Sequence, residues 1–402
     1  MKLADQERNV VLGWGVLTFI VVGMASTFNT ALPTIAEDLQ LRPAESAWLV
    51  SLYTLAFAIA TVVFARLSDR YSISKLLLAG LILGGVSSAA GMFVSDYAAL
   101  FIVRLLQAIG GGSLPGLSFI YFKKHISEGY RSTALMQLSI FIGLGFGLGP
   151  ILGGGFTHLF GWRTLFAIPA LLLIAVPIAS RLGAADSGIR TLHIQPVMRS
   201  LLSRSSYTLR IVMQFGIYFV QMSVLYLIPM QAESLSYSAI EIGCLLSPGA
   251  LCATAILWRI RRLPKEGRQD GMMLGLMAVI AGAIVLTAAG DYPIASVLIG
   301  YFCVAIGLAV ASASLNDQIA RRLTAAEASK GLALSQFVQF LGGAAGAAVS
   351  GNLLDQFRDS YARLYIGLAC IAVVTVVAYI LLNTKEKVAL MRRLGNEYQY
   401  GE

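Results

Sequence analysis

Long uncharged apolar runs limit the fold of this chain more than any other feature. The runs are about 20 residues long and are bounded by charged or turn-forming residues, which is the length that an α-helix needs to cross a bilayer. Only 13% of the residues are charged, about half the share of a soluble domain. The first run is followed by further runs of the same kind, so we interpret it as a span and not as a cleaved signal peptide. The pattern predicts an all-α polytopic membrane protein.

Twelve candidate spans follow from these runs. The longest break between them, residues 182–210, separates six spans from six. We therefore expect two pseudo-symmetric six-helix bundles, 1–181 and 211–402 with its short tail, joined by a cytoplasmic linker at 182–210. The expected spans are about 9–31, 46–65, 75–95, 98–121, 133–157, 163–181, 211–231, 240–258, 271–289, 293–315, 330–352 and 362–383.

The basic residues predict the orientation of the spans. If both termini are cytoplasmic, 25 of the 30 lysines and arginines fall in cytoplasmic segments and 4 fall outside. Cytoplasmic loops are enriched in Lys and Arg, so we expect a multi-pass protein of the cytoplasmic membrane with both termini inside. The net charge of +9 is explained by these flanks, and no nucleic-acid partner is expected.

Several functional classes lack their sequence signals. The four cysteines lie in apolar runs without metal-ligand spacing, so we expect neither a zinc site nor a disulfide. There is no phosphate-binding loop, no HExxH zinc motif and no cluster of His or acidic residues within the spans, and such motifs would be needed for ATP hydrolysis or metal chemistry. We therefore expect no enzyme activity, no cofactor and no metal.

The fifth span carries a stripe of small residues that is echoed later in the chain. Gly145, Gly149 and Gly153 repeat every four residues, with Pro150 and Gly154 beside them. Small residues at this spacing let membrane helices pack closely. A similar pattern, from Gly342 to Gly351, follows at an offset of 197 residues in span eleven. The echo predicts duplicated halves, with a substrate site between them as in secondary transporters.

These glycines also resemble a known motif. The span-five sequence is similar to G-x3-G-P-x2-G-G, the signature of drug:proton antiporters of the major facilitator superfamily, although an upstream glycine of that pattern is Met136 here. The resemblance implies the twelve-helix fold of that superfamily, and it implies that Gly149, Pro150, Gly153 and Gly154 belong to a gate.

The loop after span two resembles another superfamily motif, G-x-L-a-D-R-x-G-R-K. Asp69 and Arg70 match it, whereas Ala65 and Ser72 replace its glycines. The resemblance implies a cytoplasmic gate in which Asp69 meets a helix N-terminus of the other half, supported by Arg70. Such a charge–dipole contact is worth about 0.3–2 kcal/mol, so it can break in every transport cycle.

Span four contains an arginine near the middle of the membrane. Arg104 would cost about 2.5–3.5 kcal/mol there, so it should face the bundle interior, with Gln107 one turn onward on the same face. The segment resembles the superfamily motif R-x-x-q-G-x-g, which implies a role for Arg104 in proton coupling. Span one ends in Asn29-Thr-Ala-Leu-Pro33, similar to the drug exporters, but Met24 stands where many of them have Asp.

Neutral polar residues dominate the predicted cavity. Unpaired amides are costly in hydrocarbon, so these residues should line a wet cavity or bind one another. No carboxylate lies in the middle of a span, and Glu241 and Asp317 near span ends are the acidic candidates for proton coupling beside Arg104. The predicted substrate-binding residues are Asn29, Arg104, Gln107, Gln137, Gln214, Tyr218, Gln221, Tyr226, Gln336 and Gln339.

Three functional hypotheses remain open on this basis. The leading one is a monomeric exporter of small organic molecules, driven by proton antiport, for multidrug or metabolite efflux. The acid-poor cavity favours an alternative, a dedicated exporter of an anionic metabolite such as a carboxylate siderophore. The missing acids and the altered gate-loop glycines would also fit a membrane sensor without transport activity. The expected partners are a small-molecule substrate, protons and the lipid bilayer.

Overall fold

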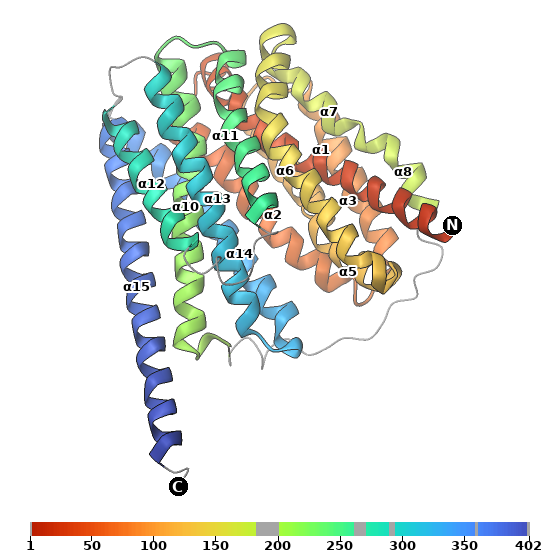
Figure 1. Ribbon diagram of the computed structural model, residues 1–402. Helices are drawn as coiled ribbons and strands as arrows, with labels where there is room; N and C mark the ends of the chain where they lie inside the picture. Colours follow the sequence, from red (N-terminus) through yellow and green to blue (C-terminus); the bar gives the residue numbers. More distant parts are fainter. Residues whose placement is uncertain (1, 182–200, 261–270, 289–293, 358–360, 400–402) are drawn as a thin grey trace.

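The computed structural model describes residues 2–181, 201–260, 271–288, 294–357 and 361–399, and these residues are helical almost throughout (Figure 1). Within this part of the chain, eleven helical segments are long and apolar enough to cross a membrane. The helices are α1 (Lys2–Asp38), α2 (Pro43–Leu67), α3 (Ile73–Gly91), α4 (Tyr97–Gly111), α5 (Ser113–His125), α6 (Glu128–Phe160), η1 (Trp162–Phe166), α7 (Ala167–Ala170), α8 (Leu172–Arg181), α10 (Ser205–Ser234), α11 (Ala239–Ile260), α12 (Gly271–Ala288), α13 (Ile294–Arg322), α14 (Ala325–Phe357) and α15 (Tyr361–Gln399).

The sixth expected span, 163–181, is not one continuous helix. Its residues form the short helices η1, α7 and α8, and its apolar stretch, Trp162–Val176, is shorter than the eleven others. Gly161 ends α6 with a φ of 83°, a backbone conformation that favours glycine. Pro169 then lacks the N–H that a regular helix would use. The expected span 98–121 is likewise divided, into α4 and α5, at Gly112.

The helices pack as two sets with one contact surface between them. The N-terminal set comprises α1 to α8, in which α1 packs on α6 and α3 packs on α4. The C-terminal set comprises α10 to α15, in which α10 packs on α14 and α12 packs on α13. The two sets meet where α6 lies along α11 and α2 lies along α14, and we call this surface the seam. Of the linker expected at 182–210, residues 182–200 lie outside the described part of the chain.

Glycines hold the helices of each set close together. A Cβ atom added to Gly149 of α6 would lie 2.8 Å from the Cβ of Ser26 on α1, and Thr27 of α1 donates a hydrogen bond to the Gly149 carbonyl at 3.0 Å. In the C-terminal set, Gly346 of α14 lies against the backbone of α10, where Ser223 donates to the Gly346 carbonyl at 3.0 Å. Gly149 and Gly346 are 197 positions apart, so they make equivalent contacts within their own sets.

A second pair of glycines with the same offset lies on the seam. Gly154 of α6 lies directly against the backbone of Ala239 on α11. Gly351 of α14 lies against the side chain of Ala47 and the backbone of Pro43 on α2. Since 154 and 351 are also 197 positions apart, both seam contacts are built by corresponding residues of the two sets.

Candidate substrate-binding core and gate

The side chain of Arg104 lies in the interior of the N-terminal set, between two aromatic rings. It is 2% exposed, so it does not face lipid. Its guanidinium carbon is 3.8 Å from the ring centroid of Phe28 on α1 and 3.9 Å from that of Tyr53 on α2. Each desolvated cation–π contact is worth up to about 2 kcal/mol. The two rings therefore offset much of the cost of placing a charge in the membrane.

A chain of hydrogen bonds fixes the orientation of this guanidinium. Nη1 of Arg104 donates to Oε1 of Gln107 at 2.6 Å, and Nε2 of Gln107 donates to Oγ of Ser88 on α3 at 2.8 Å. Ser88 in turn donates to the carbonyl of Gly84 at 2.6 Å. By contrast, Nε of Arg104 is buried and has no hydrogen-bond acceptor among the described residues. The site thus keeps one buried cationic donor available for a ligand or a water molecule.

A very small cavity of about 10 Å³, with room for roughly one water molecule, adjoins this cluster. It is bounded by Tyr53 and Gln107 of the cluster and by Met24, the residue that replaces the acid of many drug exporters. The described lining of this cavity thus contributes the thioether of Met24 and no carboxylate beside the arginine cluster.

The hydrogen-bonded cluster around Gln214 in the C-terminal set consists of uncharged groups, and the fully buried Arg210 lies one turn before Gln214 on α10. Nε2 of Gln214 on α10 donates to Oε1 of Gln339 on α14 at 3.0 Å and to Oδ1 of Asn316 on α13 at 3.4 Å. One turn along α10, the hydroxyl of Ser312 donates to that of Tyr218 at 3.2 Å. Gln214 is fully buried, and its Oε1 has no hydrogen-bond donor among the described residues. The C-terminal cluster thus has a buried acceptor without a donor, Oε1 of Gln214, whereas the N-terminal cluster has a buried donor without an acceptor, Nε of Arg104.

The remaining predicted lining residues occupy different environments. Asn29 is buried near the end of α1, Gln221 is half-buried and Gln336 is exposed. Gln137 accepts a hydrogen bond from the hydroxyl of Tyr130 at 3.3 Å, within α6. The structure therefore brings Arg104 together with Gln107 and Gln214 together with Gln339, but it does not gather the ten predicted residues into one hydrogen-bonded cluster.

The two acidic candidates for proton coupling lie near helix ends. Glu241 is exposed in the first turn of α11, where it accepts hydrogen bonds from the backbone and hydroxyl of Ser238 at 2.8 and 2.7 Å. Asp317 forms an ion pair with Arg321 of the same helix at 2.6 Å, and its side chain is 37% exposed. Both carboxylates therefore have partners close by in the sequence, Ser238 and Arg321, and among the described residues neither contacts the Arg104 cluster.

The predicted gate residues fall at two places. Asp69 is half-buried and Arg70 is exposed, in the turn between α2 and α3. Gly149, Pro150, Gly153 and Gly154 belong to the part of α6 that packs on α1 and α11. Ile151 of this segment donates its backbone N–H to the hydroxyl of Ser247 on α11 at 3.1 Å, across the seam.

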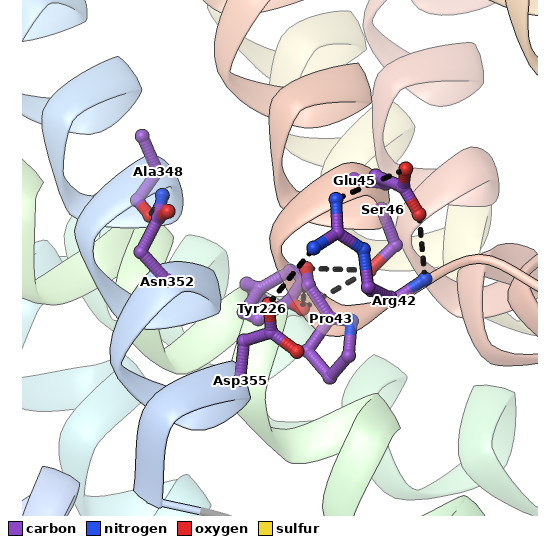
Figure 2. A network of polar contacts seen from close by, with 8 residues as sticks. All are labelled: Arg42, Pro43, Glu45, Ser46, Tyr226, Ala348, Asn352 and Asp355. Atoms are coloured by element: carbon purple, nitrogen blue, oxygen red, sulfur yellow. Dashed lines mark hydrogen bonds and ion pairs between the residues drawn. The ribbon is translucent and has the colours of Figure 1, made fainter.

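The seam carries further polar contacts at the end of the helices that holds the α1–α2 and α10–α11 turns, which we call the upper end (top of Figure 1). The hydroxyl of Tyr226 on α10 donates to the carbonyl of Pro43 at 2.7 Å and lies 3.0 Å from the hydroxyl of Ser46. Figure 2 shows Arg42 beside Asp355 of α14, with a separation of 4.0 Å between charged atoms. Tyr226, predicted as a cavity residue, thus links the two sets at the upper end of the seam.

Several residues of these clusters were not predicted. Phe28, Tyr53 and Ser88 surround Arg104 and Gln107 from three other helices, so sequence spacing does not reveal them. Asn316, beside the predicted Asp317, could have been found as a polar residue directly after the expected span 293–315.

The sequence pattern of the Major Facilitator Superfamily matches residues 14–347. The chain belongs to the Major Facilitator Superfamily. Solved structures of this superfamily's fold agree: a D-xylose–proton symporter superposes with a TM-score of 0.77 at 14% identity, over 92% of this chain and 96% of that one. The nucleoside transporter NupG superposes with a TM-score of 0.71 at 16% identity, over 93% of this chain and 99% of that one. At these identities the likeness establishes the fold alone.

Other members of the superfamily share part of the sequence. The cephamycin export protein CmcT of Amycolatopsis lactamdurans is 34% identical over 161 residues, which is 40% of this chain and 32% of that protein. An acurin A biosynthesis cluster MFS-type transporter of Aspergillus aculeatus is 29% identical over 186 residues, or 45% and 33% of the two chains. The matched segment spans about a third of these relatives. Membership of this family indicates a transporter and not an enzyme.

Proposed function

We propose that this major facilitator protein is a secondary active transporter that exports small organic molecules by proton antiport. The two helix sets would rock about the seam and expose the central polar core alternately to each side of the membrane. The expected bundles 1–181 and 211–402, connected by 182–210, are the moving bodies of this proposal. The names of the cephamycin export protein and of the biosynthesis-cluster transporter support the direction of transport.

The observation that carries the proposal is the buried cluster of Arg104. A guanidinium that is 2% exposed, held by two rings and Gln107, and bordered by a cavity has the features of a functional intramembrane charge. We assign to it substrate or proton coupling, and we assign the upper end of the seam to the gate that opens outward.

Transport into inverted membrane vesicles tests this proposal. A fluorescent organic substrate should accumulate when the vesicle interior is made acidic, and collapse of the pH gradient should stop the accumulation. Accumulation that ignores the gradient would rule out proton antiport while leaving transport in place.

The alternative substrate is an anionic metabolite, and one observation favours it. Nε of Arg104 is a buried cationic donor, and no carboxylate belongs to the described cluster around it. A carboxylate of the substrate would satisfy this donor with a charge-assisted hydrogen bond. A deletion strain separates the two substrate classes, since loss of metabolite secretion without a change in drug susceptibility would identify the dedicated exporter.

The membrane orientation is part of the same proposal. The excess of Lys and Arg in alternate loops supports cytoplasmic termini in the cytoplasmic membrane, which would place the upper end outside. Labelling of a cysteine introduced at Gln40, in the α1–α2 turn, by an impermeant reagent added to intact cells would support this orientation. Labelling only after the cells are opened would reverse it.

A further inference from the structure

One arginine at the upper end of the seam lies between carboxylates of the two helix sets (Figure 2). Nη2 of Arg42, in the α1–α2 turn, donates to Oε1 of Glu45 on α2 at 3.3 Å, and its Nη1 lies 4.0 Å from Oδ2 of Asp355 on α14. We propose that Arg42 is a conformational switch, which is shared with Asp355 while the upper end is closed and is kept by Glu45 alone when that end opens. This inference rests on the rocking motion of the proposed function.

Close packing of α14 on α2 brings Asp355 to Arg42. Gly351 of α14 lies against the side chain of Ala47 and the backbone of Pro43. Asp355 follows Gly351 by one turn, and residues four apart share a face of a helix. The glycine contact therefore places the carboxylate over the start of α2, and any separation of α14 from α2 at this end would also separate Asp355 from Arg42.

The ion pair is not part of the duplicated framework of the seam. At the offset of 197, the position equivalent to Asp355 is His158 of α6, and the position equivalent to Arg42 is Ala239 of α11. Alanine carries no charge, so the equivalent positions cannot form such a pair. The charges are thus an addition to one edge of the seam, whereas the glycine packing is common to both edges.

The guanidinium of Arg42 can serve two carboxylates because its donors point in different directions. The partner within the set is held in place, since Oε2 of Glu45 also accepts the backbone N–H of Arg42 at 2.9 Å. The hydrogen bond to Glu45, together with the charges of Glu45 and Asp355, raises the pKa of Arg42 above its ordinary value. Both acids therefore act on one cation, and this cation keeps a partner after Asp355 has moved away.

The exposure of the three side chains makes the switch easy to reverse. The side chain of Arg42 is 68% exposed, and those of Glu45 and Asp355 are 33% and 30% exposed. Ion pairs in such surroundings are weak and are screened by salt. The contact between Arg42 and Asp355 therefore biases the upper end toward closure without locking it, as a gate that opens in every transport cycle requires.

Spin-label distances across the upper end test the proposal. The labels are attached at Ser95→Cys, in the α3–α4 turn, and at Ser236→Cys, in the α10–α11 turn, which are exposed positions in different sets. The four native cysteines are replaced by serine in this full-length background, and the protein is placed in nanodiscs. The distance distribution then gives the fraction of molecules that are open at the upper end.

Two substitutions should change this fraction in opposite directions. Asp355→Asn removes the partner across the seam, so the open fraction should rise about two- to threefold. Glu45→Gln leaves Arg42 to Asp355, so the open fraction should fall by about the same factor, and glutamine can still cap the start of α2. The control is Asp38→Asn, which removes an exposed ion pair with Arg163 at the same end but within the N-terminal set, and which should leave the open fraction unchanged.

Shifts of Asp355→Asn and Glu45→Gln in the same direction, or shifts no larger than that of Asp38→Asn, would overturn the switch. Salt gives a second readout, because screening should open the upper end of the unmodified protein more than that of Asp355→Asn. Vesicle uptake separates this inference from the proposed function. Transport driven by the pH gradient with unchanged distances would overturn the switch alone, whereas opposite distance shifts without transport would overturn the proposed function and leave the switch in place. Matching size-exclusion profiles establish that the variants are folded.

Discussion

The two helix sets share a framework but differ at their polar cores. Residues 197 positions apart make equivalent glycine contacts, both inside each set and on the seam. The core of the N-terminal set nevertheless contains a buried cation held between two aromatic rings. In the C-terminal set, the described cluster around Gln214 contains amides and hydroxyls, and the buried cation of that set, Arg210, lies one turn away on α10. The packing of the two sets is thus alike at these positions, while the polar clusters differ.

Under the proposed function, the two clusters would contribute differently to the selection of a substrate. A cation in low dielectric interacts strongly with any charged ligand, whereas neutral amides contribute hydrogen bonds of about 1 kcal/mol each. If the core functions as we propose, the N-terminal set selects the charge of the substrate and the C-terminal set recognises its shape and polar groups.

Replacement of Arg104 should have the largest effect. We expect Arg104→Gln to lower transport by about 10- to 100-fold, because charge-assisted hydrogen bonds worth about 1.5–3 kcal/mol are lost. Arg104→Lys should also fail, since an ammonium cannot stack between Phe28 and Tyr53 as a planar guanidinium does. Vesicle uptake at equal protein content measures the effect. The matched variant in the other core, Gln214→Leu, should lose less than Arg104→Gln, and the opposite order would break the comparison of the two cores.

Enlargement of a seam glycine should have the next largest effect. Gly154→Leu would force α6 away from the backbone of Ala239, at a cost of about 1–3 kcal/mol for overpacking. Thermal unfolding in detergent measures this loss, with Gly155→Leu as the control because the space around Gly155 is open. Gly351→Leu, at the equivalent position of α14, should behave like Gly154→Leu. A large difference between these two variants would contradict the shared framework.

Removal of the Tyr226 hydroxyl should have a moderate effect on conformation. Tyr226→Phe loses the hydrogen bonds to Pro43 and Ser46, worth about 1 kcal/mol, so the population open at the upper end should rise about fivefold. Distances between spin labels on the α1–α2 and α10–α11 turns report this change. Tyr218→Phe is the control, since the Tyr218 hydroxyl contacts Ser312 within one set. If both variants open the upper end equally, Tyr226 has no special role at the seam.

Titration of Glu327 should have the smallest effect on stability. Glu327 forms an ion pair with Arg204, and this pair lies outside the core of the C-terminal set. Hydrogen bonds from the Thr324 backbone and from Arg204 lower the pKa of Glu327 below its ordinary value of 4.5. A carboxylate with a lowered pKa stabilises the folded state fully above its unfolded pKa, and this contribution is lost as the pH falls through the folded pKa. Melting temperatures of the unmodified protein and Glu327→Gln should therefore differ slightly at pH 7, begin to converge near pH 4.5 and coincide once the pH is below the lowered pKa of the folded state. A difference that persists in strong acid would contradict this assignment.

The sequence predicts much of this fold because hydrocarbon imposes simple requirements. Apolar runs of bilayer length specified the helices, and the span-five glycines specified close packing, since a side chain there would collide with a neighbouring backbone. The cost of an intramembrane charge placed Arg104 toward the interior. The division of the expected span 163–181 could also be anticipated from Gly161 and Pro169. The continuous apolar run nevertheless predicted one helix there.

The polar clusters were less predictable, because their partners come from different helices. Hydrophobic periodicity gives the face of one helix, but not which residue of another helix meets it. The stacking of Tyr53 and Phe28 on Arg104, and the bond from Tyr226 to Pro43, depend on the relative rotation of helices far apart in sequence. The linker expected at 182–210 stays a prediction, because residues 182–200 lie outside the described part of the chain.

The hydrogen bond from Tyr226 ends on a main-chain oxygen, that of Pro43. Every amino acid carries such an oxygen, so no codon change at position 43 can delete this acceptor. A single substitution would remove the bond most directly if it replaced Tyr226, which carries the donor hydroxyl. This bond therefore depends on one aromatic side chain of α10, while position 43 of α2 can change its side chain without removing the acceptor, as long as the helix keeps its course.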